Sequence, residues 1–327
     1  MKNKLLFHLR LLVSQSTILV GGQAVIEGVM MRVPGAYATA VRDSKGKIHF
    51  NRSNFKSITE FYPLLKKPII RGIVGVYESL KMGYSTLQWS AEISELNEES
   101  PERTNKFIEF LLTLFSIALA LGLFVIAPMG LTSWLFEKDQ DAFIFNLISG
   151  LFRISFFLIY LVLISFINDV KRLFQYHGAE HKSVYNFESG KDLSINNAQC
   201  FPTQHPRCGT SFMFIIMIVA ILSFAALDSF IMLYVEELKI WMRIILHIPF
   251  IPIVSGMGYE VLKLTSKYRN NFFFRILSKP GLLLQNITTK QPDDKQVEVA
   301  LMALEKAFGD NLSQYTTGKK FVAEAIG

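Results

Sequence analysis

The chain has 327 residues, of which 50% are hydrophobic, and a formal net charge of +7. Its mean hydropathy of +0.31 is too apolar for an ordinary soluble protein and favours a membrane protein. The sequence has no basic stripe with interleaved aromatic residues, so nucleic acid is not an expected partner. The basic residues suit contact with anionic membrane lipid instead.

Residues 1–20 place leucines at helical spacing around Arg10. This pattern predicts a short basic amphipathic helix that lies on the membrane. A signal peptide is the alternative, although His8 and Arg10 interrupt the apolar stretch that such a peptide needs.

Residues 21–106 predict a small α+β region that faces the cytoplasm. Short apolar stretches up to residue 50 favour strands, and Asp-Ser-Lys-Gly at 43–46 is a hairpin turn signal. Between residues 68 and 92 the apolar spacing becomes helical. Glu27 and Arg32 are charges within apolar, strand-like sequence, so each either faces solvent or points into a site.

Four apolar segments follow, and each has roughly the 20 residues that a helix needs to cross a bilayer. The predicted fold class is therefore an α-helical polytopic membrane protein with about four transmembrane helices. Its membrane domain would cover residues 107–284, with the third and fourth spans forming a helical hairpin. The expected spans are residues 107–127, 143–167, 212–235 and 240–259.

Basic residues on one side of these spans predict their orientation. They precede the first span and follow the second and fourth, whereas the two opposite connections are mainly acidic. By the positive-inside rule both termini and the segment 168–211 face the cytoplasm, and the expected location is the cell's inner membrane. The residues that carry this bias include Arg103, Lys106, Lys171, Arg172, Lys263, Lys267, Arg269, Arg275 and Lys279.

Residues 285–327 predict a C-terminal cytoplasmic helix followed by a tail. Asp293, with Gln296 three positions later, forms a capping-box pattern at the start of that helix. Apolar residues then recur at helical spacing from Val297 to Phe308 and predict a buried face.

The polar segment 168–211 contains three of the six histidines and both cysteines. In His-Gly-Ala-Glu-His at 177–181 the two histidines are four apart, so on a helix they share one face. That spacing can bind one metal ion through two imidazoles, with Glu180 as base or third ligand. His205 and Cys208 could supply the remaining ligands, and such a mixed set suits zinc. The alternative is a chance match with interfacial histidines.

The first functional hypothesis is a zinc-dependent membrane enzyme, most simply a hydrolase with an unknown substrate. His177 and His181 would bind the ion. The third ligand would be His205 or Cys208. Glu180 would accept a proton from water that the ion activates.

Further charged residues are candidates for binding and catalysis. Arg32, Lys182 or Arg207 would hold an anionic substrate. Glu27 and Arg32 are expected to approach the site, because they are charges in an apolar, glycine-flanked strand.

The second hypothesis is a non-catalytic scaffold or partner-binding protein with a structural metal site. A closed set of four ligands would favour it, because catalytic zinc keeps one position open. Transport is a third hypothesis, but four spans are few for a transporter. Cys200 and Cys208 face the cytoplasm in this topology, so they are expected to be thiols or ligands rather than a disulfide.

Among the ionisable residues within the expected spans, Arg153, Asp228 and His247 stand out. Isolated charges there are costly, so Asp228 is expected to face the bundle interior with His247 or Arg153 as its partner. The competing interpretation places Asp228 outside the bilayer, in a broken third helix. Pro249 and Pro252 should kink the fourth span.

Five motifs give the chain a resemblance to the bacterial DUF1385, or YqhQ-like, family of membrane proteins. The resemblance covers roughly residues 20–308 and implies a predicted metal-dependent enzyme with no established reaction. Val33 departs from the glycine expected before Pro34 and puts only the local turn in doubt. The motifs include Gly-Gly-Gln-Ala-Val-Ile-Glu-Gly-Val-Met-Met-Arg at 21–32, Tyr-His-Gly-Ala-Glu-His-Lys at 176–182 and His-Pro-Arg-Cys-Gly-Thr-Ser-Phe at 205–212, with further matches at 258–260 and 291–300.

Overall fold

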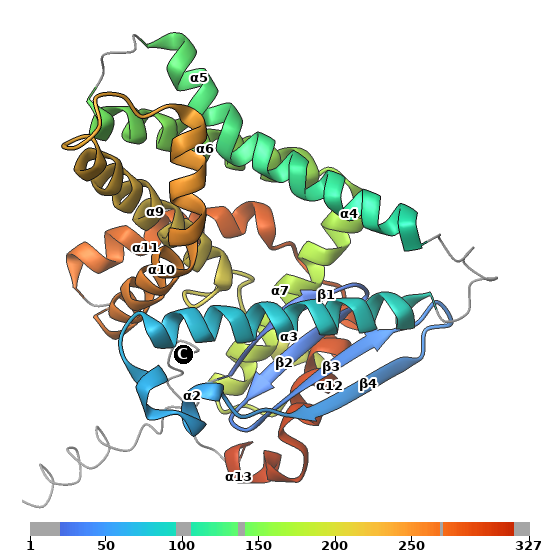
Figure 1. Ribbon diagram of the computed structural model, residues 1–327. Coiled ribbons are helices and arrows are strands. Elements are labelled where there is room, and N and C mark those ends of the chain that lie inside the picture. The colour runs from blue at the N-terminus through green and yellow to red at the C-terminus, as the bar shows by residue number, and fades with distance from the viewer. Residues whose placement is uncertain (1–19, 96–105, 137–140, 269–270, 317–327) are drawn as a thin grey trace, which may run out of the picture.

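The computed structural model describes residues 20–95, 106–136, 141–268 and 271–316 of the chain (Figure 1). The amphipathic helix predicted for the first 20 residues and the end of the C-terminal tail lie outside the described residues. The described part has two regions. One is a bundle of long apolar helices, and the other is a small antiparallel sheet with helices on both faces (Figure 1).

The sheet is a four-stranded antiparallel meander in the order β1-β2-β3-β4. The turn predicted at residues 43–46 joins β3 and β4, and Gly46 there has a φ of 86°. The strand predictions for this region are therefore confirmed. The strands are β1 (Gly21–Val25), β2 (Gly28–Val33), β3 (Ala36–Arg42) and β4 (Ile48–Asn54).

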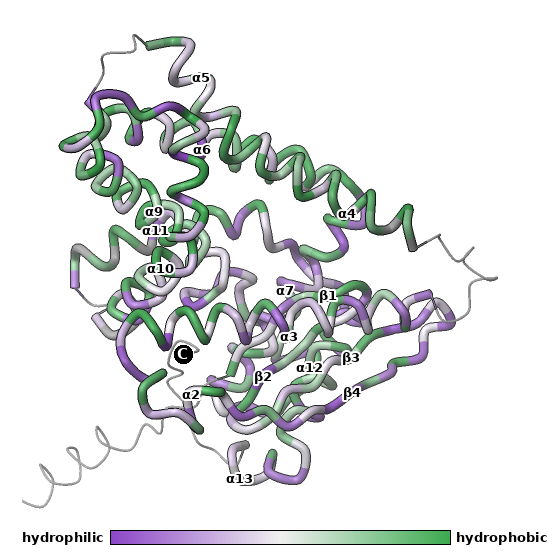
Figure 2. The backbone as a smooth tube through the Cα atoms, viewed as in Figure 1, coloured by the Kyte–Doolittle hydropathy of each residue, from purple (hydrophilic) through white to green (hydrophobic). Residues whose placement is uncertain are grey.

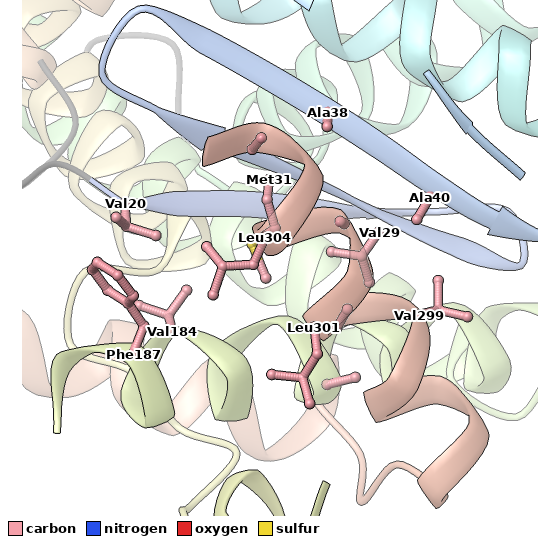
Figure 3. Packing of buried hydrophobic residues seen from close by; sticks show 14 of the residues in the cluster. Val20, Val29, Met31, Ala38, Ala40, Val184, Phe187, Val299, Leu301 and Leu304 are labelled. Atoms are coloured by element: carbon pink, nitrogen blue, oxygen red, sulfur yellow. The ribbon is translucent and has the colours of Figure 1, made fainter. Parts of the chain in front are cut away.

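One face of the sheet packs on helix α12 (Asp294–Phe308) and helix α7 (Asn168–Glu188). Alternate residues of neighbouring strands point into this core, for example Met31 beside Ala38, and Leu304 of α12 meets them (Figure 3). The predicted capping box at Asp293 is present, and every apolar residue predicted for the buried face of α12 is buried. Segments near the two ends of the sequence thus share one hydrophobic core.

The other face of the sheet is covered by α3 (Ile70–Ser94), which agrees closely with the helix predicted from residue 68 to residue 92. Two short helices precede it, α2 (Ile58–Phe61) and the 3₁₀ helix η1 (Pro63–Lys66). The buried Glu78 of α3 accepts a hydrogen bond from the backbone of Ile58 at 2.6 Å and so fixes the start of α2.

Within the described residues, four helices are long and apolar enough to cross a membrane, as the sequence predicts (Figure 2). The first continues past the expected end at residue 127, because α4 (Lys106–Leu121) runs through a π-helical turn, η2 (Gly122–Ile126), into α5 (Ala127–Leu135). The fourth runs without interruption through Pro249 and Pro252 and beyond residue 259. The other helices of this set are α6 (Ala142–Ile164), α9 (Gly209–Ile231) and α10 (Ile240–Lys267).

Two features of the polar segments were not predicted. Most of the expected loop 168–211 is helical, with α7 followed by the short α8 (Ile195–Gln199). The chain after α10 forms α11 (Phe272–Thr288), although Pro280 and Gly281 resemble a helix break. Gly281 is needed there for packing, since a Cβ at that position would lie 2.5 Å from Ser211 of α9. The described chain ends with η3 (Gly309–Asn311) and α13 (Leu312–Thr316).

Candidate metal centre

Helix α7 carries His177 and His181 on one face, as their spacing predicts, and their ring centroids are 4.5 Å apart. Cys208 approaches them from the N-cap position of α9. One ligand atom from each of the three residues lies within 4.8 Å of the other two. Imidazole nitrogen and cysteine sulfur are donor types that zinc binds in proteins.

Each histidine is oriented by a backbone carbonyl. His177 Nδ1 lies 2.8 Å from the carbonyl oxygen of Thr288, and His181 Nδ1 contacts the carbonyl oxygen of Thr203. When each Nδ1–H donates to its carbonyl, the Nε2 atom keeps its lone pair for a ligand. His177 Nε2 is 3.1 Å from Cys208 Sγ. His181 Nε2 is buried and makes no hydrogen bond within the described part of the chain.

Because position 178 is glycine, the backbone of residues 288–290, whose Thr288 carbonyl contacts His177, can pack directly against α7. A Cβ at this position would lie 2.1 Å from the carbonyl oxygen of Lys290. The same segment is tied to α7 because the Lys290 N–H donates to the Phe174 carbonyl at 2.9 Å. A larger residue at 178 would therefore push away the backbone that carries the Thr288 carbonyl.

Glu180 is 5% exposed and lies beside the three residues, with its carboxylate 3.5 Å from His181 Nε2. Burial raises the pKa of Glu180, and a backbone hydrogen bond from Gly22 of β1 partly offsets this. Burial lowers the pKa of His177 and of His181, so both imidazoles are neutral at pH 7. Neutral imidazole is the form that binds metal, and a carboxyl with a raised pKa is suited to proton transfer.

His205 lies next to this group but does not join it. Its ring centroid is 5.6 Å from that of His181, yet its Nε2 is 3.3 Å from Arg207 and 3.8 Å from Glu188. The buried Gln285 explains this placement, because its side-chain amide holds the backbone of His205 at 2.7 and 2.9 Å. Of the two residues that the sequence left open as third ligand, Cys208 is the one whose ligand atom meets the histidines.

The basic residues proposed to hold an anionic substrate are engaged elsewhere. Arg207 forms an ion pair with Glu188. Lys182 is 2% exposed and donates to the carbonyls of Gln199 and Phe201, so it fixes the loop that leads to Thr203. Burial lowers the pKa of Lys182.

Glu27 and Arg32 do not reach the metal group. Glu27 has a φ of 50° in the turn between β1 and β2, where it pairs with Arg172 and accepts from the Tyr176 hydroxyl at 3.2 Å. Arg32 stacks over the Phe55 ring at 4.3 Å. It points away because neighbouring residues of β2 face opposite sides of the sheet and Met31 already faces α12.

Several residues of the site carry no sequence signal. Thr203 and Thr288 act through backbone carbonyls, which any residue could supply, and Gln285 acts through a hydrogen bond across 80 positions. Cys200 is exposed and Cys208 is buried, and both are free thiols, as expected.

Asp228 forms a second buried cluster, within the apolar helices. It is fully buried and meets His247 Nε2 at 2.8 Å, which confirms one of the two expected partners. Its other partners are Arg243 and Asn146, and neither was predicted. Helix α9 continues through Asp228, so the alternative of a broken third helix is wrong.

Arg153 does not pair with Asp228. Its Nε donates to the carbonyl oxygen of Phe124 at 3.0 Å. Phe124 lies in the π-helical turn Gly122–Ile126. A π-helical turn disturbs the regular backbone hydrogen bonding of a helix, so a carbonyl there can accept from a side chain. The partner of Arg153 Nε is therefore a backbone carbonyl rather than a carboxylate.

Comparisons with known proteins agree with the motifs. A family model described as "Protein of unknown function (DUF1385)" matches residues 67–310. The "Uncharacterized protein YqhQ" of Bacillus subtilis (strain 168) is 34% identical over 296 residues, which cover 86% of this chain and 89% of that relative. No solved structure gives a significant match. The chain therefore belongs to the DUF1385 family of proteins of unknown function.

Proposed function

We propose that this protein is an integral membrane protein with a zinc-type metal site at its cytoplasmic face, and that it acts there as a hydrolase. One observation carries the proposal. Two neighbouring imidazoles have their Nδ1 atoms held by backbone carbonyls, and one ligand atom of each histidine lies within 4.8 Å of the Cys208 thiol. Outer partners of this kind are typical of metal-binding histidines.

The residues present fit zinc better than magnesium or calcium. Two imidazole nitrogens and one sulfur are soft or intermediate donors, whereas Mg²⁺ and Ca²⁺ prefer oxygen. The buried Nε2 of His181 lacks a hydrogen-bond partner among the described residues, and a metal ion would satisfy it. A bound zinc ion would supply Lewis-acid activation of water or of a substrate carbonyl or phosphoryl group.

Glu180 is the residue that would transfer a proton in this site. Its carboxylate lies 3.5 Å from His181 Nε2, and its side chain packs against Gly22 of β1. The low exposure of Glu180 limits access of bulk water. His177 and His181 would bind the ion together with Cys208, which leaves one position of a four-coordinate site for substrate or water.

The membrane location rests on the apolar helices and on the basic residues at their ends. The metal group lies where α6 and α9 meet the sheet region, since α7 begins four residues after α6 ends and Cys208 caps α9. The positive-inside rule assigns this end to the cytoplasm, and both termini with it.

A second candidate function is a structural metal site in a scaffold protein. It is favoured by burial, because Glu180, His181 and Cys208 are 5%, 2% and 6% exposed. If Glu180 took the fourth position, protein ligands would fill all four coordination positions, and the ion would only hold α7 against α9.

The first experiment measures bound metal in protein purified from a membrane fraction. Wild-type protein is expected to contain one equivalent of zinc, and His181→Ala should lose it. His49→Ala is the matched control, because His49 pairs with Asp43 on the sheet, away from this group. Wild-type protein without metal, or equal metal loss in both variants, would contradict the metal site.

The second experiment separates the catalytic from the structural site. The zinc is replaced by Co²⁺, and the visible spectrum is recorded while azide is added. An open position predicts a spectral change on azide addition, and Glu180→Gln should keep the metal while abolishing hydrolysis of ester, amide or phosphoester test substrates. A spectrum that azide leaves unchanged, together with no hydrolysis, would favour the structural site.

A further inference from the structure

Helix α3 has the reverse of the usual arrangement of a surface helix. Its buried positions are mostly small or polar: Gly72, Glu78, Met82, Thr86 and Ser90. On the opposite side large apolar residues are exposed, and from Tyr77 onward they recur every three or four positions. They are Ile70 at 40%, Tyr77 at 57%, Leu80 at 70%, Tyr84 at 71% and Leu87 at 42%. We call these five residues the outer face of α3.

Hydrogen bonds hold the inner side of α3 to the sheet region. Gln23 of β1 donates to the Thr86 hydroxyl at 2.9 Å, and the Ile26 N–H donates to the Ser90 hydroxyl at 3.1 Å. These bonds attach the sheet to α3 through polar groups, so the large apolar residues of the outer face take no part in them. Contiguous apolar side chains left exposed in this way mark an interaction surface.

The start of α3 lies against the fourth apolar helix. A Cβ at Gly72 would be 2.8 Å from the Gly256 carbonyl oxygen, and Arg71 forms an ion pair with Glu260. Gly256 and Glu260 fall within the apolar span Ile240–Thr265. In Figure 1, α3 runs across the molecule between the sheet and the apolar helices. The outer face is thus continuous with the surface that the apolar helices present.

The charges on the part of α3 that carries the outer face, from Ile70 to Ser90, suit an anionic surface, and the exposed Glu92 lies beyond this part. Between Ile70 and Ser90 the single acidic residue is Glu78, which is buried and points inward. Lys81 is exposed beside Leu80. The outer face therefore consists of leucine, isoleucine and tyrosine, has the exposed Lys81 beside it, and contains no carboxylate.

We propose that the outer face of α3 lies in the headgroup and upper acyl region of the bilayer that the apolar helices cross. Tyrosine rings are enriched at that depth, and amphipathic helices with basic flanks bind there. This inference rests on the membrane location proposed above. It also sets the depth of the candidate metal site relative to the bilayer, because Gly22, next to Gln23 on β1, packs against Glu180.

The test uses full-length protein in vesicles of phosphatidylcholine and phosphatidylglycerol. In a Cys200→Ser background, single cysteines are introduced as Leu80→Cys, Tyr84→Cys, Leu119→Cys and Asp310→Cys and labelled with bimane. Fluorescence quenching by lipid with a nitroxide near the headgroup is then measured. Leu119 is an exposed residue of α4 and reports on membrane insertion. Asp310 is exposed in η3, beside α13 at the end away from the apolar helices (Figure 1). The unmodified background measures labelling at Cys208.

The proposal expects severalfold stronger quenching at Leu80→Cys and Tyr84→Cys than at Asp310→Cys. Quenching at Leu119→Cys but not at the two α3 positions would overturn it and leave the membrane location intact. If Leu119→Cys is also unquenched, the membrane location itself fails. Disulfide-linked dimers through Leu80→Cys in dilute vesicles, without lipid quenching, would show that a second copy covers the face and would likewise overturn the proposal.

Discussion

His177 Nε2 lies 3.1 Å from Cys208 Sγ, although the two residues are 31 positions apart. The contact joins the middle of α7 to the first turn of α9. One more distant segment, α11, supports it through two residues. Thr288 orients the imidazole, and Gln285 fixes the backbone of the loop that leads to Cys208. The candidate metal centre is therefore a meeting point of three helices rather than a property of one motif.

Gly178→Ala is expected to weaken metal binding without removing a ligand. Its Cβ would overlap the Lys290 carbonyl at 2.1 Å and displace the Thr288 carbonyl from His177. Loss of an outer partner costs about 10- to 100-fold in metal affinity. Gly209→Ala is the matched control, because no heavy atom lies within 4 Å of its Cβ position. Competition with a chromogenic chelator measures both affinities, and equal affinities would contradict the role given to Gly178.

The stability of the metal-free protein is expected to fall as the pH drops from 6.5 toward 4. Burial lowers the pKa of His205 to about 4, so the unfolded chain takes up a proton in this window before the folded chain does. Stability from neutral His205 is fully present above pH 6.5 and is lost as the pH falls through that range. The change is up to about 3 kcal/mol, since one pKa unit corresponds to about 1.4 kcal/mol.

Thermal unfolding in detergent with a chelator, from pH 4 to pH 8, measures this dependence. His205→Asn should reduce the slope between pH 4 and 6.5, the remainder coming from His177 and His181, whose pKa burial also lowers, and an unchanged slope would contradict the assignment. Glu180 acts in the opposite sense. Burial raises the pKa of Glu180, so the stability that Glu180 contributes is lost as the pH rises through its folded-state pKa. Glu180 therefore cannot account for a loss of stability on the acid side.

Asp228→Asn is expected to destabilise the protein by about 3 kcal/mol, because it leaves the buried Arg243 without its charge partner. Double-mutant cycles identify the partners. Coupling with Arg243→Met or His247→Phe should be about 1 kcal/mol or more, as for residues in direct contact. Coupling with Arg153→Met should be near zero, since Arg153 donates to the Phe124 carbonyl. Strong coupling with Arg153 alone would contradict this arrangement.

Gly72→Ala should destabilise the contact between α3 and α10, whereas Gly75→Ala should not. The added Cβ would lie 2.8 Å from Gly256 backbone at position 72 but 4.0 Å from Tyr259 at position 75. Overpacking of this kind costs about 1–3 kcal/mol. At an open helical position alanine instead gains up to about 1 kcal/mol over glycine. Thermal unfolding in detergent compares the two variants, and equal melting temperatures would show that the helices do not pack this closely.

The amino-acid sequence determines the local parts of this protein. Apolar run length predicts the four long helices, turn chemistry predicts the hairpin at residues 43–46, and the Asp293–Gln296 capping box starts α12. The four-residue spacing places His177 and His181 on one helix face. These features depend on neighbours within a few positions, so periodicity and propensity are sufficient to predict them.

Tertiary structure alone decides which residues the candidate site contains. Cys208 meets the two histidines whereas His205 turns to Arg207 and Glu188, because Gln285 holds the His205 backbone. In the same way Asp228 meets Arg243 rather than Arg153, and Arg32 faces away from the site. Each outcome depends on a side-chain direction fixed by a segment many positions away. A one-dimensional pattern contains the residues for such a contact but not the direction in which each side chain points.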